Sequence, residues 1–395
     1  MRSGNDTAVR ARVARGLTAV PAITLAALAV GCGSTTPGTA TAARPTASLP
    51  LGTAVSATGA TWTVLPMGVP RGHNLFWQLF VLPAGGRQWK LATPPDVDTN
   101  GAFAVSVTGA QSLAAGVRPS QLLRFSPVSS TANGGRTWLA GPPDPGLAEV
   151  PDALAAAPQG GQLLALDRTG RVEQGRTGWT TLTSLRRLAA TSAARSCAPA
   201  ALTAVAFSPS GQPVVAARCA RPGSAGIFAE QGGHWSAAGP TLPGALSGQR
   251  IEVLRLVRTG SRLTALLQSG SGPAARRLVA WQAADGRWTV SAPLPGSGAV
   301  LSSSFGASGA IVVELTGRRA EFLAGPGAAW QALPRLPQGH AVTLALPASG
   351  GVDALAADGS VLTAWRLHAS GSAIGAGQWA MTQTIKVPIQ YGSSS

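Results

Sequence analysis

Short apolar runs separated by glycine- and proline-containing turns dominate this chain from about residue 60 onward. The clearest example runs from Leu202 to Phe207, continues through a turn at 208–211, and resumes from Pro213 to Ala217. Runs of about four to eight residues rich in Val, Leu and Ala and bounded by Gly or Pro are typical of β-strands. No stretch has the apolar period of an amphipathic helix. The pattern therefore predicts an all-β chain.

A glycine-containing turn followed by tryptophan recurs through this strand-rich region, at intervals of 41 to 56 residues. The tryptophans are Trp89, Trp138, Trp179, Trp235, Trp288, Trp330 and Trp379. A period of roughly 40–50 residues with strand-type content is the signature of a β-propeller of four-stranded blades. We expect each tryptophan to open the same strand of its own blade and to be buried between neighbouring blades.

The best-formed copy of this unit is Thr131 to Trp138, which reads TANGGRTW. Asn133 can bond to its own loop backbone, and Gly134 and Gly135 supply positive φ. The stretch resembles the Asp-box of sialidase-type (BNR) repeats, with Thr131 for the usual Ser and Asn133 for the usual Asp. The resemblance implies a sialidase-like propeller fold carried by a bacterial secreted lipoprotein.

The two ends of the repeat region each hold too few strands for a blade, so we expect them to pair in one composite blade that closes the ring. With six complete intervals this predicts a seven-bladed β-propeller over residues 60–391, and counts of six or eight stay open. The alternative is a Trp-rich β-sandwich in which the spacing arises by chance.

The N-terminus has the pattern of an export signal. Four arginines precede a charge-free run from Leu17 to Val30, which is the length of a signal-peptide core and short for a membrane span. The run ends at Gly31-Cys32 and resembles a lipoprotein lipobox, although Ala29 replaces the preferred Leu. We predict a signal peptide over 1–31, lipidation of Cys32, and a flexible Thr/Ala/Ser/Pro-rich tether over 32–59. An ordinary signal peptide or an uncleaved anchor is the alternative.

Cys197 and Cys219 are the other two cysteines, and in an exported protein such a pair is most simply a disulfide. The formal net charge is +16, but the arginines are scattered singly, which argues against a nucleic-acid-binding face. We expect attraction to anionic surfaces and a monomeric protein held at the outer face of the membrane by its lipid anchor.

Enzyme motifs are missing from the sequence. Sialidases of this fold use a Tyr–Glu pair, an acidic Asp and three arginines, yet the one tyrosine here is Tyr391, close to the C-terminus. The chain has no Gly-x-Ser-x-Gly elbow, no His-Glu-x-x-His and no phosphate-binding loop. The closest acid pair, Asp96 and Asp98, reads as a solvated loop, and His234 as an exposed turn residue. We therefore predict no catalytic residues, no cofactor and no metal.

The sequence leaves two hypotheses of function. The first is a non-catalytic propeller that acts as a binding or scaffold module for an unknown protein or glycan ligand. The second is a divergent propeller enzyme, either a glycan-active hydrolase or a quinoprotein-like dehydrogenase. Trp77, Trp281 and Trp365 lie outside the repeat position, and we interpret them as core unless one lines a binding face.

Overall fold

A computed structural model describes residues 53–68, 76–94, 103–108, 112–117, 128–140, 151–158, 161–175, 178–246, 248–295, 298–370 and 373–388. Helix in these residues is limited to α1 (Leu185–Ala189) and the 3-10 turns η2 (Ser192–Ala194), η3 (Gly244–Leu246) and η4 (Gly272–Ala274). None of these described helices is long and apolar enough to cross a membrane. The prediction of an all-β chain is confirmed.

The strands form antiparallel sheets of four, and one sheet of eight. The four-stranded sheets follow chain order: β1 (Thr53–Val55), β2 (Thr61–Met67), β3 (Phe76–Leu82) and β4 (Lys90–Leu91); β5 (Phe103–Thr108), β6 (Ser112–Val117), β7 (Val128–Thr131) and β8 (Leu139–Ala140); β9 (Ala153–Ala156), β10 (Leu163–Leu166), β11 (Arg171–Gly175) and β12 (Trp179–Ser184); β21 (Val300–Phe305), β22 (Ile311–Leu315), β23 (Arg319–Leu323) and β24 (Gln331–Ala332); β25 (Ala341–Ala345), β26 (Val352–Asp358), β27 (Val361–Ser370) and β28 (Ala373–Lys386).

The eight-stranded sheet consists of two groups of four. They are β13 (Pro199–Phe207), β14 (Pro213–Pro222), β15 (Gly226–Gln231) and β16 (His234–Ala237), then β17 (Arg250–Thr259), β18 (Arg262–Ser269), β19 (Arg276–Gln282) and β20 (Trp288–Val290). The end of β14 pairs with the start of β17, through Arg218 opposite Glu252 and Pro222 opposite Arg250. Among the described residues this strand pairing merges the two groups into one sheet, and each group keeps the hairpin order of the smaller sheets.

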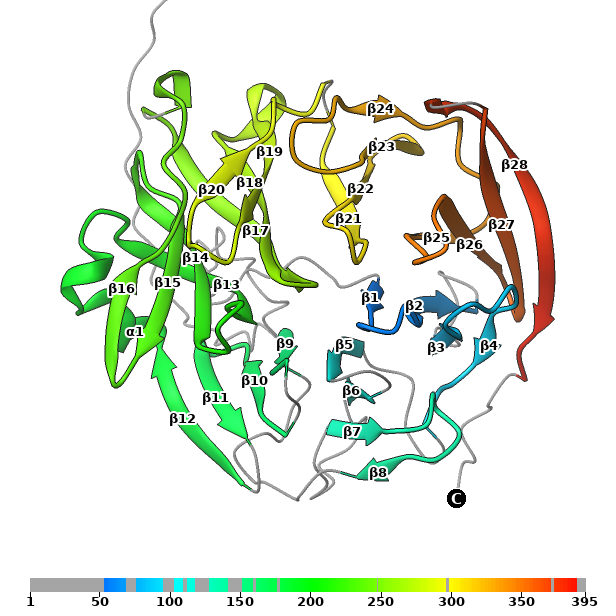
Figure 1. Cartoon of the computed structure of the whole chain (residues 1–395), viewed down its shortest axis with the longest axis horizontal. Helices are drawn as coiled ribbons and strands as arrows, with labels where there is room; N and C mark the ends of the chain where they lie inside the picture. Colours follow the sequence, from blue (N-terminus) through cyan, green and yellow to red (C-terminus); the bar gives the residue numbers. More distant parts are fainter. Residues whose placement is uncertain are drawn as a thin grey trace, which may run out of the picture. The chain divides into compact units, whose positions relative to one another are not determined.

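Within residues 53–388 the sheets stand around a common centre, with the first strand of each group of four nearest that centre (Figure 1). The fourth strands, such as β12 and β28, lie on the outside. The inner strands differ in burial: β13 buries every residue from Ala201 to Phe207, whereas about half of the residues of β17 and β21 are buried. The inner strands therefore determine what lies at the centre.

The seven repeat tryptophans each lie in, or directly before, the fourth strand of a group. Each packs at the boundary with another group, as Trp235 does against a cluster that includes Leu164 and Val172 of the β9–β12 sheet. The extent of burial differs among them: Trp89 is 2% exposed, whereas the other six are half-buried. Outer strands sit at the edge of each sheet, so one side of an indole there faces solvent unless a neighbouring sheet covers it.

Three of these indoles bind the backbone of the group that precedes them in the chain. Trp288 Nε1 donates to the Ala238 carbonyl at 2.8 Å, Trp330 Nε1 to that of Ala292 at 3.0 Å, and Trp379 Nε1 to that of Pro334 at 3.4 Å. Each acceptor lies just after the fourth strand of the preceding group. The repeat tryptophan thus joins consecutive groups by both packing and a hydrogen bond.

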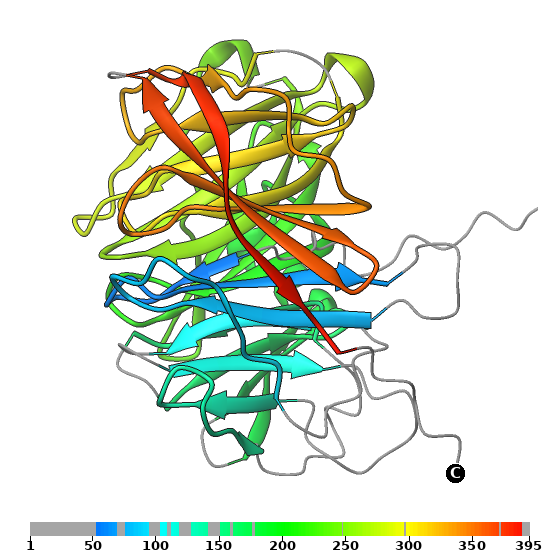
Figure 2. The same ribbon diagram turned by 90° about the vertical axis from the view of Figure 1, so that its right-hand side faces the viewer.

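The first and last sheets meet side by side (Figure 2). The expectation of a composite blade is wrong, because β1–β4 and β25–β28 each contain four strands from one continuous stretch. Trp89 Nε1 donates to Asp353 Oδ2 at 3.1 Å, and the Gln383 side-chain amide binds both the N–H and the carbonyl of Trp89, at 2.8 and 3.0 Å. A shared apolar cluster that includes Leu65 and Leu355 completes the contact.

The first sheet has a fourth strand because β1 comes from the stretch that was predicted to be a flexible tether. Thr53 pairs with Thr63 and Val55 with Thr61, so the predicted tether over 32–59 is too long at its C-terminal end. The small residues that suggest a linker here also suit an inner strand, where space is limited.

The Thr131–Trp138 turn, between β7 and β8, is held by its own side chains. Thr131 Oγ1 accepts from the Gly135 N–H at 3.0 Å, and Asn133 Oδ1 accepts from the Thr137 N–H at 2.9 Å. Asn133 Nδ2 also donates to Thr137 Oγ1 at 2.6 Å. Trp138 then stacks edge-on against Trp62 of β2, with ring centroids 6.3 Å apart. The turn thereby fixes the outer strand against the first sheet.

Candidate functional site

A cavity of about 460 Å³ lies among the inner strands. Its walls come from 53–57 at β1, Ser106 of β5, 153–156 and Pro158 at β9, 204–207 of β13, 255–260 at β17, and 305–307 at β21. These segments are mostly the C-terminal parts of inner strands and the turns that follow. The cavity therefore reaches from the middle of the strands toward one end of the domain.

Small side chains create this space. Alanines at 153, 155, 156, 204 and 206 line it, together with the larger walls Phe207 and Phe305. At one end of the lining the turns approach closely: Gly260 has φ of +58°, and a Cβ there would lie 3.2 Å from the Ala307 carbonyl oxygen. Glycine permits both the left-handed backbone and this approach.

Two arginines of β17, Arg255 and Arg258, supply the charge of the lining. The register of β17 against β18 shifts between Val253 and Arg255, a bulge of the kind that redirects side chains. Arg255 is 3% exposed, and burial lowers its pKa to about 10. Burial also lowers the pKa of Arg258. Both guanidinium groups stay protonated at neutral pH but are less stable as cations than in water.

The described lining contains no Asp, Glu, His or Cys. The side-chain Nε of Arg258 is buried and forms no hydrogen bond with a described residue. The Thr53 hydroxyl, on a residue 5% exposed, is likewise buried without a partner in the described part of the chain. Buried polar groups normally have partners, so these two atoms are among the exceptions in the described part of the chain.

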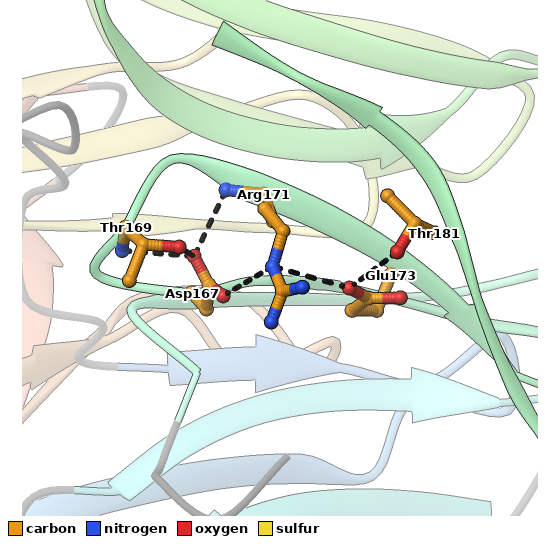
Figure 3. A network of polar contacts seen from close by, with 5 residues as sticks. All are labelled: Asp167, Thr169, Arg171, Glu173 and Thr181. Carbon is orange, nitrogen blue, oxygen red and sulfur yellow. Dashed lines mark hydrogen bonds and ion pairs between the residues drawn. The ribbon is translucent and has the colours of Figure 1, made fainter. Parts of the chain in front are cut away.

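Elsewhere the fold brings two acids together at a turn. Asp167 and Glu173 both lie within reach of Arg171, whose Nε is 3.4 Å from Asp167 Oδ2 and 3.6 Å from Glu173 Oε1 (Figure 3). Asp167 Oδ1 also accepts from the N–H and hydroxyl of Thr169 and from the Arg171 N–H, and Thr181 donates to Glu173 at 2.9 Å.

These bonds stabilise the β10–β11 turn and the start of β11. The turn lies at the end of its sheet opposite Pro158, because Leu166 pairs with Ala153 while Leu163 pairs with Ala156. The Asp167–Glu173 network is therefore separate from the cavity and engaged in structure.

The remaining residues singled out from the sequence lie apart from the cavity. The Sγ atoms of Cys197 and Cys219 are 2.11 Å apart, at bonding distance, inside the cluster that Trp235 covers. His234 is exposed, as expected. Trp281 is 2% exposed and donates to the Gly309 carbonyl. Trp77 and Trp365 are half-buried and pack against core clusters. Cys32, Asp96, Asp98 and Tyr391 lie outside the described residues.

No group of three or more metal-ligating side chains occurs in the described part of the chain. Sequence reasoning missed Arg255 and Arg258, because Arg255 lies within a mainly apolar run and Arg258 directly after it. The available signal for Arg255 was its charge inside the run from Ile251 to Val257, which is apolar except for Arg255 and Glu252.

No family model and no curated protein sequence matches this chain. Solved structures do resemble it. A GH74 xyloglucanase from Xanthomonas campestris is 17% identical with a TM-score of 0.52, over 86% of this chain and 55% of that chain. The chain also matches a structure of YCF48 bound to a D1 peptide, with 16% identity and a TM-score of 0.43, over 82% of this chain and 90% of that chain. It matches a structure of virginiamycin B lyase from Staphylococcus aureus with 10% identity and a TM-score of 0.45, over 80% of this chain and 91% of that chain.

At these identities the likeness concerns the fold alone. The xyloglucanase is a β-propeller protein, and this chain spans about half of its length. Sheets of four strands placed around a common centre agree with that architecture. The chain therefore has a β-propeller fold.

Proposed function

We propose that this chain is a seven-bladed β-propeller that binds a ligand in its central cavity without transforming it. The twenty-eight strands of the described residues divide into seven groups of four, once the eight-stranded sheet is separated at the β14–β17 pairing. The turn at Thr131 to Trp138, with its Thr–Gly and Asn–Thr hydrogen bonds, supports the resemblance to an Asp-box repeat.

One observation carries the binding role: the central cavity is lined by apolar walls, two arginines and hydroxyl groups. A concave, mostly apolar site with a few convergent polar groups is the usual form of a small-ligand site. Its volume, about 460 Å³, lies in the range of such pockets. General acid–base catalysis would require a titratable group near the substrate, and the described lining offers none at neutral pH.

The test is a thermal-shift screen of small metabolites and glycan fragments on the wild type and on Ala156→Trp, which places a large side chain in the cavity. Ligands of the cavity should raise the unfolding midpoint of the wild type and leave the variant unchanged. Ligands that stabilise both proteins equally would place binding elsewhere. Release of sugar from a polysaccharide would instead support the divergent-enzyme alternative.

We also propose that the propeller is exported and held at the outer face of the membrane through an acylated Cys32. The charge-free run before Gly31-Cys32 and the Thr/Ala/Ser/Pro-rich segment after it support this proposal. Cells given a clickable palmitate analogue should label the wild type and leave Cys32→Ser unlabelled. Equal labelling of the two proteins would refute acylation at this cysteine.

A further inference from the structure

We propose that one end of the propeller is a membrane-contact surface, where exposed arginines lie against anionic phospholipid headgroups. We call it the arginine end. It consists of the connections β12–β13, β14–β15, β16–β17 and β18–β19 and the strand residues that border them. This inference rests on the proposed attachment through Cys32, and it adds which end of the domain faces the membrane.

The fold gathers at this end arginines that are dispersed over some ninety positions of the sequence. Neighbouring strands are antiparallel, so every second connection along the chain lies at the same end of the sheets. The exposed arginines in or beside the four connections are Arg186, Arg187, Arg195, Arg221, Arg250 and Arg276. Only the tertiary arrangement brings them to one surface.

Backbone and side-chain contacts join these connections to one another. Arg221 Nη1 donates to the Arg195 carbonyl at 2.8 Å, which links β14–β15 to β12–β13. Pro222 pairs with Arg250 across β14 and β17. The Gly270 N–H, in the β18–β19 connection, donates to the Arg250 carbonyl at 2.9 Å. The arginines therefore belong to one continuous surface.

Acids are missing from the four connections. Neither Asp nor Glu occurs in residues 185–198, 219–225, 238–250 and 270–276. Two acids that border them are paired: Glu252 Oε1 lies 3.9 Å from Arg218 Nη1, and Asp167 Oδ2 lies 3.4 Å from Arg171 Nε. The six exposed arginines form no ion pair with a described residue. Positive charge without nearby acids creates a field that attracts anions.

The opposite end of the same strands has a mixed charge. Its turns and their borders carry Glu230 and Asp285 as well as Arg262 and Arg287. Arg287 Nε also lies 2.6 Å from Asp285 Oδ2. The cavity is lined mostly by the C-terminal parts of the inner strands, so it reaches toward this mixed end. A membrane at the arginine end therefore leaves the cavity facing away from it.

Phospholipid headgroups fit the arginine end. A guanidinium binds phosphate through paired N–H donors. The six arginines come from four connections and none lines the cavity, so they suit many headgroups in a plane better than one small molecule. The exposed large apolar side chains among the described residues lie outside the four connections; they are Leu91, Leu139, Leu301 and Met381. Contact should therefore stay at the level of the headgroups.

The proposed anchor favours a membrane over a soluble polyanion. Twenty residues separate Cys32 from Thr53. A segment of this length spans at most about 70 Å when fully extended. The domain would thus meet the membrane at a high effective concentration, at which a weak attraction of each arginine is enough to orient it.

The experiment is vesicle flotation of the full chain carrying Cys32→Ser, so that no acyl chain contributes. Vesicles of phosphatidylglycerol and phosphatidylcholine present anionic headgroups. Pure phosphatidylcholine vesicles measure binding through the apolar run before Cys32, and the quantity compared is the excess over these neutral vesicles.

Two triple variants of this parent chain separate the arginine end from net charge. The first combines Arg221→Gln, Arg250→Gln and Arg276→Gln. The matched control combines Arg87→Gln, Arg136→Gln and Arg262→Gln, which are exposed positions at the opposite end. Each set removes three charges and one side-chain hydrogen bond to a backbone carbonyl. Equal thermal unfolding midpoints show that the three proteins are folded.

The arginine-end variant should bind anionic vesicles about a hundredfold more weakly than the parent chain, since each arginine near an anionic surface contributes about fivefold. The control should stay within about threefold of the parent chain. The reason is that the ten residues of β17 span about 33 Å, whereas the Debye length is about 10 Å at about 0.1 M salt. Raising the salt to about 0.5 M should release the parent chain.

Three results would each overturn the membrane-contact surface: equal binding of the parent chain to anionic and neutral vesicles, equal losses in the two variants, or binding that salt does not change. Soluble polyphosphate tests the alternative of an acidic polymer. If it binds the parent chain at a lower phosphate concentration than the vesicles do, and through the same arginines, the surface serves a polymer instead. Acyl labelling of Cys32 is a separate measurement, so failure of the anchor and failure of the surface are distinguishable.

Discussion

Trp89 holds the first sheet to the last, and its truncation should be the most damaging of the repeat substitutions. The indole is 2% exposed and donates to Asp353 Oδ2 at 3.1 Å. Replacing a buried tryptophan by alanine costs about 3–5 kcal/mol through lost burial and the cavity left behind, and the lost hydrogen bond adds about 1 kcal/mol. Asp353 keeps its ion pair with Arg366, at 2.7 Å, so no buried carboxylate is stranded.

Trp89→Ala should therefore lower the free energy of unfolding by about 4–6 kcal/mol, a large share of the 5–15 kcal/mol typical of folded domains. Trp235→Ala is the matched control, because this indole occupies the same repeat position but is half-buried and should cost about 2 kcal/mol. Urea unfolding followed by circular dichroism measures both.

The contribution of the hydrogen bonds between the first and last sheets can be measured separately from the burial of the Trp89 indole. Gln383→Ala removes both side-chain bonds to the Trp89 backbone and leaves the indole in place. It should cost about 1–3 kcal/mol, since a backbone N–H and a carbonyl lose their partners. Suppose that Trp89→Ala and Trp235→Ala shift the urea midpoint equally, and that Gln383→Ala does not shift it. The contacts of Trp89 and Gln383 between the first and last sheets would then contribute nothing to stability.

Three further outcomes are expected. Trp62→Ala should cost about 3–5 kcal/mol in urea unfolding, because Trp62 is 0% exposed; a loss below that of Trp235→Ala would contradict this. Mass mapping without reduction should find Cys197 linked to Cys219, and Gly226→Ala should cost about 1–3 kcal/mol because its Cβ would lie 2.8 and 2.9 Å from the two sulfurs; free thiols in exported protein, or a neutral Gly226→Ala, would count against the bridge and its packing. Burial raises the pKa of Glu314, although the Ser302 hydrogen bond and Arg318 each oppose the change. The folded protein is therefore more stable with Glu314 protonated, and it loses this stability as pH rises through the raised pKa. Glu314→Gln should then be more stable than the wild type at pH 7, with the difference shrinking toward pH 4.5, and a constant difference across this range would exclude the mechanism.

The hairpins and the repeat follow from the sequence alone, for a local physical reason. Strand length, turn glycines and the tryptophan that opens each fourth strand depend on neighbouring residues, so the turn from Thr131 to Trp138 can be read without knowing the rest of the fold. The same locality explains the main error at the N-terminus. Ala54 and Val55 resemble linker by composition, and only their pairing with β2 makes them an inner strand.

The closure of the ring and the content of its centre were decided by tertiary structure. Trp89 and Gln383 are 294 residues apart, and no local pattern indicates that they meet. Arg255 and Arg258 read as parts of a strand and a turn until six inner strands enclose them with Thr53. Packing of distant strands fixes which side chains share a cavity and how far each is removed from water. The proposed binding of a ligand depends on both.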